Sequence, residues 1–111
     1  MWIMIAGPYT SGANSDAERQ ANLDAMNEAA LEVLEKGHVP IIGVNLALPI
    51  INVAGHEKFD DIMMPVSLAV AERCDACLRI GGPSVGADQE MAKFRSRGLD
   101  VFQSVGDIPR I

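Results

Sequence analysis

The chain has 111 residues, which fits a single domain spanning 1–111, since independent domains usually hold roughly 100–200 residues. Apolar residues make up 49% of the sequence, so a packed core is expected. The net charge of −6 and the lack of any Lys/Arg run argue against a nucleic-acid polymer as partner, because that binding depends on neutralising phosphates. A single mononucleotide remains possible, since backbone N–H groups and hydroxyls can hold one phosphate.

The apolar N-terminal run Met1–Ala6 is too short for a signal peptide and far too short to span a membrane. Two Cys in a chain without an export signal indicate a reducing compartment, so a cytoplasmic protein without a membrane partner is expected. A domain this small buries only about two-thirds of its unfolded surface. We therefore expect a homodimer or higher homo-oligomer.

The first elements follow from short local signals. Trp2–Ala6 is an apolar run that ends at a Gly-Pro pair, which predicts a buried strand followed by a polar loop, Gly7–Asn14. Ser15-Asp16-Ala17-Glu18 has the spacing of a capping box and predicts a helix beginning at Ser15. Apolar residues then recur every three or four positions until Gly37, which is expected to end the helix.

The middle of the chain is less regular. A second strand is expected at about His38–Ile42, and a second helix at Phe59–Arg73. The segment between them, Gly43–His56, is apolar but contains Gly, Asn and Pro, and its structure stays unassigned. Ala76–Ile80 reads as a third strand, although Arg79 is unusual in a buried one.

The last elements are a loop at Gly81–Val85 and a third helix at Gly86–Arg97, which Gly98 is expected to end. Leu99–Gln103 is predicted as a fourth strand, and Gly106–Ile111 as a short tail.

Alternating strands and helices predict an α/β domain, a flavodoxin-like three-layer sandwich with a central parallel sheet of about four strands. Ligands of such sheets bind outside the carboxyl ends of the strands, where the strand order reverses. In the flavodoxin-like order the first and third strands are neighbours at that point. The loops that follow them, Gly7–Asn14 and Gly81–Val85, are therefore expected to line one crevice.

The first loop reads Gly7-Pro8-Tyr9-Thr10-Ser11-Gly12; its glycines allow close backbone approach to a ligand, and Tyr9, Thr10 and Ser11 offer hydroxyl donors. It lacks the Gly-Lys-Ser/Thr of a Walker motif and the glycine spacing of a Rossmann motif, so an ordinary strand-to-helix turn is an equal alternative. In the second loop, Ser84 can cap the following helix, whose first N–H groups can receive an anion. Glu90 falls near the crevice, where helix electrostatics alone would also favour a carboxylate.

Other reactive side chains have structural interpretations. Cys74 and Cys77 form a Cys-x-x-Cys where a helix enters a strand, opposite to the thioredoxin arrangement, so buried structural thiols are expected. No second pair completes a metal site, and His38 and His56 are far apart in sequence. No cofactor or metal is predicted.

Four short patterns occur in a characteristic order: Gly7-Pro8-Tyr9, Gly37-His38-Val39-Pro40, Cys74-Asp75-Ala76, and the Ser-x-Gly-x-x-x-Glu of Ser84, Gly86 and Glu90. Together they resemble the nucleoside 2-deoxyribosyltransferase-like superfamily, which includes the 2'-deoxynucleoside 5'-phosphate N-hydrolases. The resemblance covers nearly the whole chain and is strongest to short bacterial and phage-type members. It implies one deoxyribosyltransferase-like domain that binds a nucleoside or nucleotide.

The resemblance also implies residue roles. Glu90 would be the nucleophile that attacks C1' and displaces the base, as in a retaining glycosidase, and Tyr9 would position the sugar or the carboxylate. The hydrolases place a serine six residues before the glutamate to hold the 5'-phosphate, and this chain has Ser84 there. Gly7, Pro8 and Gly86 would complete the binding loops.

One position departs from the family pattern. The family carries an Asp eight residues before the position of Asp75, where it helps protonate the leaving base, and this chain has Ser67 there. General acid catalysis is commonly worth about 10²–10⁴-fold in rate. Asp61, one or two turns earlier, is a candidate substitute, whereas Asp75 is expected to be structural. A binding or sensing module that has lost the chemistry is therefore the alternative to an N-glycosidase or deoxyribosyltransferase.

Overall fold

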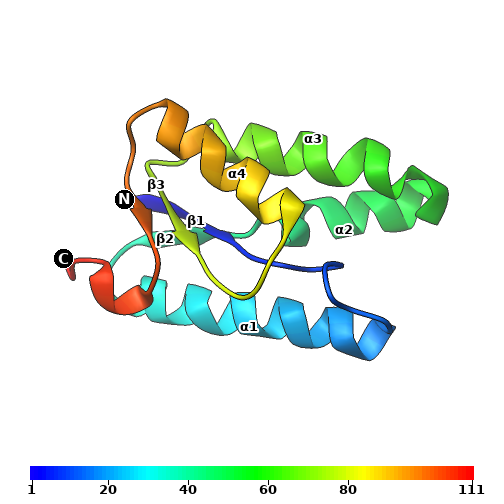
Figure 1. Ribbon diagram of the computed structural model, residues 1–111, viewed down its shortest axis with the longest axis horizontal. Coiled ribbons are helices and arrows are strands. Elements are labelled where there is room, and N and C mark those ends of the chain that lie inside the picture. The colour runs from blue at the N-terminus through cyan, green and yellow to red at the C-terminus, as the bar shows by residue number, and fades with distance from the viewer.

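Four parallel strands form one sheet in the order β2-β1-β3-β4, and the computed structural model describes all of residues 1–111 (Figure 1). The strands are β1 (Trp2–Ala6), β2 (Val39–Ile41), β3 (Ala76–Arg79) and β4 (Val101–Phe102). β1 pairs with β2 on one side and with β3 on the other, so the strand order reverses between β1 and β3. The predicted flavodoxin-like α/β fold is confirmed.

Helices lie on both sides of this sheet (Figure 1). The long helix α1 (Asp16–Glu35) runs along one side, together with the short 3-10 helix η2 (Val105–Asp107). On the other side α3 (Phe59–Ala71) packs against both α4 (Val85–Ser96) and α2 (Gly43–Ala54). The 3-10 turn η1 (His56–Lys58) connects α2 to α3. None of these helices is both long and apolar enough to cross a membrane.

The first helix begins as its capping box predicts. Ser15 Oγ accepts a hydrogen bond from the Glu18 N–H, and Glu18 Oε2 accepts one from the Asn14 N–H at 3.0 Å. The chain leaves the helix at Gly37, whose φ of +95° lies in the left-handed region that favours glycine. The orientation of α1 beside β1 and β2 is thus fixed by signals at both of its ends.

The unassigned segment Gly43–His56 forms helix α2 over nearly its whole length, followed by the start of η1. Pro49 lies inside this helix, where it removes one backbone donor. The side chain of Pro49 is exposed, while Val44, Ala47 and Ile51 pack into the core. Burial of this apolar face outweighs the weak local helix signal.

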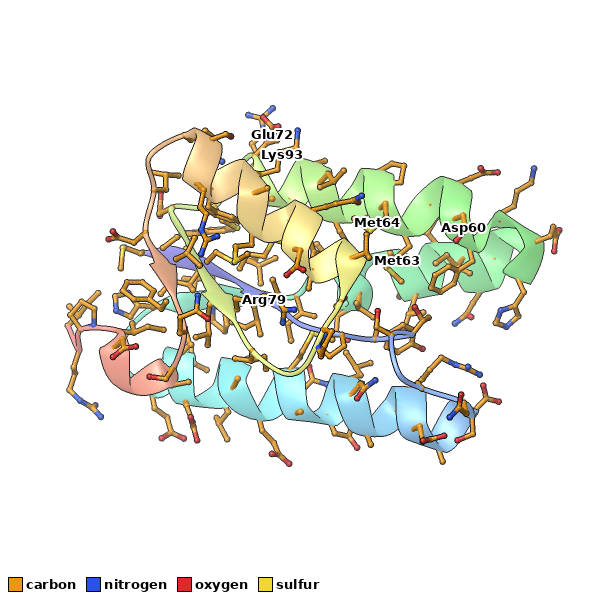
Figure 2. All side chains as sticks on the ribbon, viewed as in Figure 1. Asp60, Met63, Met64, Glu72, Arg79 and Lys93 are labelled. Atoms are coloured by element: carbon orange, nitrogen blue, oxygen red, sulfur yellow. The ribbon has the colours of Figure 1, made fainter.

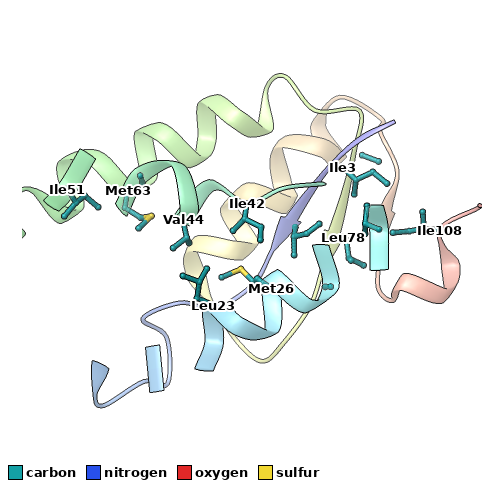
Figure 3. Packing of buried hydrophobic residues seen from close by; sticks show 14 residues of the cluster. Ile3, Leu23, Met26, Ile42, Val44, Ile51, Met63, Leu78 and Ile108 are labelled. Carbon is teal, nitrogen blue, oxygen red and sulfur yellow. The ribbon is translucent and has the colours of Figure 1, made fainter. Parts of the chain in front are cut away.

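The side chains of β1 alternate between two parts of the core. Ile3 and Ile5 pack with residues of α1, α2 and β3, as Figure 3 shows for Leu23, Met26 and Leu78. Met4 and Ala6 point to the opposite side, where they pack with residues of α3, α4 and β3. Both faces of the strand are therefore buried, which explains its nearly continuous apolar sequence.

Several predicted elements extend a few residues beyond the observed ones. The fourth strand covers only two of the five residues in the predicted Leu99–Gln103, and the second predicted helix ends at Ala71. The predicted tail is ordered by hydrogen bonds to the end of α1: Lys36 Nζ donates to the carbonyls of Val105 and Ile108 at 2.6 and 2.7 Å.

Candidate functional site

A pocket of about 290 Å³ opens at the carboxyl ends of β1 and β3. This volume is at the lower end of the roughly 300–1,000 Å³ typical of ligand sites. Its walls come from the loop after β1, the first half of α3, the start of α2 and the first turns of α4. The lining residues are Gly7, Tyr9, Thr10, Ser11, Val44, Phe59, Asp60, Met63, Met64, Ser67, Ser84, Val85, Gly86, Ala87, Gln89 and Glu90.

The two loops predicted to line one crevice do touch. A Cβ placed on Gly81 would lie 2.7 Å from Pro8 Cδ, and Gly81 has a left-handed φ of +78°. A Cβ on Gly7 would lie 3.2 Å from the Ile80 carbonyl oxygen. Pro8 does not line the pocket, so it joins the loops rather than facing the cavity. Gly7 lines the pocket, and the absence of a side chain there also lets the loop after β1 pack closely against Ile80.

Glu90, on the second turn of α4, is the most unusual residue of the pocket. Its side chain is buried, with the residue only 7% exposed, and its carboxylate accepts no hydrogen bond from the protein. Burial raises the pKa of Glu90 from 4.5 to about 7, and the nearby positive charge of Arg79 opposes part of that rise. No side-chain oxygen that is closed off from solvent lacks a partner, so the Glu90 carboxylate opens to the pocket, where a group with a raised pKa is a candidate site residue.

Arg79 is the last residue of the buried strand β3, and its polar contacts account for an arginine at this position (Figure 2). Its guanidinium donates to the carbonyls of Ile80 and Gly82 and forms an ion pair with Asp88, with Nε 3.2 Å from Oδ1. These contacts join β3, the loop after it and the first turn of α4. The arginine thus fixes the loop that carries Ser84.

Ser84 is the N-cap of α4, as predicted. Its Oγ accepts a hydrogen bond from the Ala87 N–H at 3.1 Å, which leaves the hydroxyl hydrogen free to donate. The N–H groups of Val85 and Gly86 meet no acceptor within the protein. A Cβ on Gly86 would lie 3.3 Å from Met64 Sδ, so glycine lets α4 approach α3 here. This helix start can receive an anion.

Tyr9 faces an aromatic partner that the sequence did not suggest. The rings of Tyr9 and Phe59 are stacked with their centroids 6.4 Å apart and an angle of 10° between their planes. The Tyr9 carbonyl accepts a hydrogen bond from Asn22 Nδ2 at 2.8 Å, which ties the loop to α1. Both aromatic residues line the pocket, so they offer a flat apolar surface to a ligand.

Five residues of α3 line the pocket at the spacing of one helix face: Phe59, Asp60, Met63, Met64 and Ser67. Ser67 is only 1% exposed and its Oγ contacts Met63 Sδ at 3.9 Å. Asp61 lies about 100° further round the helix, is exposed, and does not line the pocket. The structure thus brings Asp60, rather than the Asp61 expected from sequence, to the cavity.

The remaining reactive side chains lie outside the pocket. Both cysteines are free and buried; burial raises the pKa of Cys74, and raises that of Cys77 to about 12 with help from the charge of Glu90. His38 is buried and bonded through Nε2 to the Pro109 carbonyl, and His56 is exposed. Asp75 accepts a hydrogen bond from the Trp2 N–H at 2.8 Å, which is a structural role.

Comparison of the sequence with protein-family models finds no matching family, and comparison with curated proteins finds no similar sequence.

Proposed function

We propose that this protein cleaves the N-glycosidic bond of a (deoxy)nucleoside 5'-monophosphate, with Glu90 as the nucleophile. The observation that carries the proposal is the Glu90 carboxylate: it lines the pocket, is buried, and accepts no hydrogen bond from the protein. Within the fold this carboxylate is stabilised only by the nearby positive charge of Arg79, and a positive centre in a ligand would stabilise it further. The oxocarbenium-like C1' of a departing nucleoside is such a centre.

The residues around Glu90 offer a contact for each part of a nucleotide. The start of α4 offers the Ser84 hydroxyl and the N–H groups of Val85 and Gly86 to a phosphate. The stacked rings of Tyr9 and Phe59 offer a surface for a planar base. The sugar would lie between them, against Glu90.

The chemistry then proceeds in two steps. In the first step a Glu90 oxygen forms a bond to C1' while the C1'–N bond breaks. The electron pair of the C1'–N bond leaves with the base, which takes up a proton from solvent. Water next attacks C1', breaks the ester to Glu90 and gives its extra proton to solvent or a nearby base. The products are the free base and the sugar phosphate.

Free-base release tests this proposal. Purified protein is incubated with a panel of nucleoside and deoxynucleoside 5'-monophosphates, and bases are separated by chromatography. Release by the wild type that disappears in Glu90→Gln supports the proposal. Release that survives unchanged in Glu90→Gln removes Glu90 as nucleophile.

The second candidate function is nucleotide binding without turnover, and Ser67 is the observation that favours it. The residue is buried in the pocket wall at the position where the resemblance expects an acid. Thermal stabilisation of the wild type by a monophosphate, without release of base from any member of the panel, would establish this function instead.

A further inference from the structure

Helix α2 begins beside the pocket without a side-chain cap. The N–H groups of Gly43 and Val44 have no partner within the helix, because the first turn of a helix leaves its N–H groups free. The pairing of β1 with β2 ends at Ile41, and neither N–H group donates in a turn, loop or cap. Both residues are buried, and Val44 lines the pocket (Figure 3). Buried backbone donors nearly always have a partner, so these two indicate a ligand or ordered water at the start of α2.

The Ser67 hydroxyl lies against this helix start. A Cβ on Gly43 would collide with Ser67 Oγ, so glycine is what lets the hydroxyl approach the backbone here. Ser67 is only 1% exposed and lines the pocket, and the one hydrogen-bond partner of its hydroxyl is the Met63 sulfur at 3.9 Å. A thioether is a weak acceptor. The hydroxyl hydrogen is therefore available to an acceptor atom of a ligand.

These donors and Glu90 reach the pocket from different walls. Val44 belongs to α2, Ser67 to α3 and Glu90 to α4, and α3 packs against both other helices. A nucleophile attacks C1' on the face away from the departing base, so the carboxylate and the contacts to the base must come from different sides. Ser67 lies about two turns beyond Phe59 on α3, which places it toward the sugar end of a base stacked on Phe59 and Tyr9.

The common bases all carry a lone-pair acceptor next to the glycosidic nitrogen, O2 in the pyrimidines and N3 in the purines. When the C1'–N bond breaks, its electron pair leaves with the base, and the negative charge spreads to this acceptor. Donors that are already in place stabilise charge that develops during a reaction. The positive end of an uncapped helix adds to this effect.

We propose that Ser67 and the start of α2 stabilise the departing base. Ser67 Oγ–H and the Val44 N–H donate to the acceptor next to the glycosidic nitrogen, and the base leaves as an anion that afterwards takes a proton from solvent. This inference rests on the proposed function. It makes Ser67 a catalytic residue that supplies by hydrogen bonding the help that an acid at this position would give by protonation.

The dependence of the rate on the leaving base tests this role. The 5'-monophosphate of deoxyuridine and its 5-fluoro analogue are compared, because fluorine makes the departing uracil anion less basic and so less dependent on hydrogen bonds. Loss of one positioned donor commonly costs about 10²–10³-fold in kcat. We expect Ser67→Ala to lower kcat about 10²-fold for the uracil nucleotide and about tenfold or less for the fluorinated one. A fluorinated analogue of any other base that the nucleotide panel shows to be released serves in the same way.

Two further variants complete the experiment. Ser67→Cys keeps a similar volume but carries a weak donor, so it should show the same unequal losses, and it replaces the alanine variant if that one does not fold. Ser96→Ala is the matched control, since it removes an exposed hydroxyl at the end of α4, outside the pocket. Its rates with both nucleotides should equal those of the wild type.

Equal losses with the two nucleotides, an effect on KM alone, or unchanged rates in Ser67→Ala would each overturn the role of Ser67. If the wild type releases base and Glu90→Gln does not, such a result contradicts only this inference and leaves the proposed function standing. Absence of release from every nucleotide contradicts the proposed function, and this inference with it.

Discussion

Pro8 occupies the space that a side chain on Gly81 would need: a Cβ at position 81 would lie 2.7 Å from Pro8 Cδ. One residue belongs to the loop after β1 and the other to the loop after β3. Because these strands are neighbours in the sheet, this contact joins the two loops beside the pocket. The shape of the site therefore depends on glycine at a position that does not line it.

Gly81→Ala is expected to lower the free energy of unfolding by about 2–3 kcal/mol. About 1 kcal/mol of this is the cost of a side chain at a left-handed φ, and the rest comes from displacing Pro8. Gly98→Ala is the matched control, since Gly98 has a φ of +68° but open space around its Cβ direction. Urea unfolding of both variants checks the difference, and equal losses would mean that the loop contact contributes nothing.

Glu90→Gln is expected to stabilise the protein above pH 7. The unfolded chain loses the Glu90 proton near its ordinary pKa of 4.5 and the folded chain near 7, so between these values the folded state binds more protons. Wild-type stability should fall as pH rises through this window, by up to about 3 kcal/mol, and then level off. Below pH 4 the Glu90 carboxyl is protonated in both the folded and the unfolded state, so its ionisation no longer lowers the stability of the folded protein.

Thermal unfolding between pH 4 and pH 9 measures this effect. The Glu90→Gln profile should lack the decline between pH 4.5 and pH 7. Glu28→Gln, which removes an exposed carboxylate from α1, should keep it. Parallel profiles for wild type and Glu90→Gln would show that Glu90 ionises as it does in the unfolded chain.

If the protein cleaves nucleotides, kcat/KM should rise with pH and level off above about pH 8. The nucleophile must be ionised, and with a pKa of about 7 only about one hundredth of Glu90 is ionised at pH 5. The rate at pH 5 should accordingly be about one hundredth of the plateau. A nucleotide's own phosphate loses its second proton near about pH 6, so the profile is repeated with a nucleoside that lacks the phosphate. A flat profile for both would contradict an ionised Glu90 as nucleophile.

Phe59→Leu is expected to weaken nucleotide binding by about tenfold or more, because stacking of a base on an aromatic ring contributes roughly 1–3 kcal/mol. Leucine keeps most of the apolar volume, so the fold should be retained. Phe102→Leu is the control: Phe102 packs against the core outside the pocket. Calorimetric titration of both variants gives the comparison. Equal affinities would show that the base does not lie on the rings.

The elements with strong local signals could be predicted from sequence. Ser15 and Glu18 mark the start of α1, and Gly37 and Gly98 end their helices at left-handed φ values. Helix α2 could not be predicted, because Gly43 and Pro49 weaken its local signal and its stability comes from packing against distant residues.

The pocket residues that lie in the loops after strands could be predicted from sequence, as for Tyr9 after β1 and Ser84 after β3. The wall from α3 was not, because the face of a helix that lines a cavity depends on how the helix packs. The spacing of Asp60, Met63, Met64 and Ser67 was visible, but nothing local showed which side of α3 it would face. Asp60 and Asp61 are both exposed, and the step of about 100° between them decides that only Asp60 lines the pocket.

The pocket draws its walls from residue 7 to residue 90, so no short segment of the chain contains it. Only the fully folded chain can bind a ligand there, and a bound ligand therefore shifts the equilibrium against unfolding. At a ligand concentration of 100 times Kd this linkage is worth about 2.7 kcal/mol. In a small domain such an increment is a large share of total stability, so the occupied protein should resist proteolysis longer than the empty one.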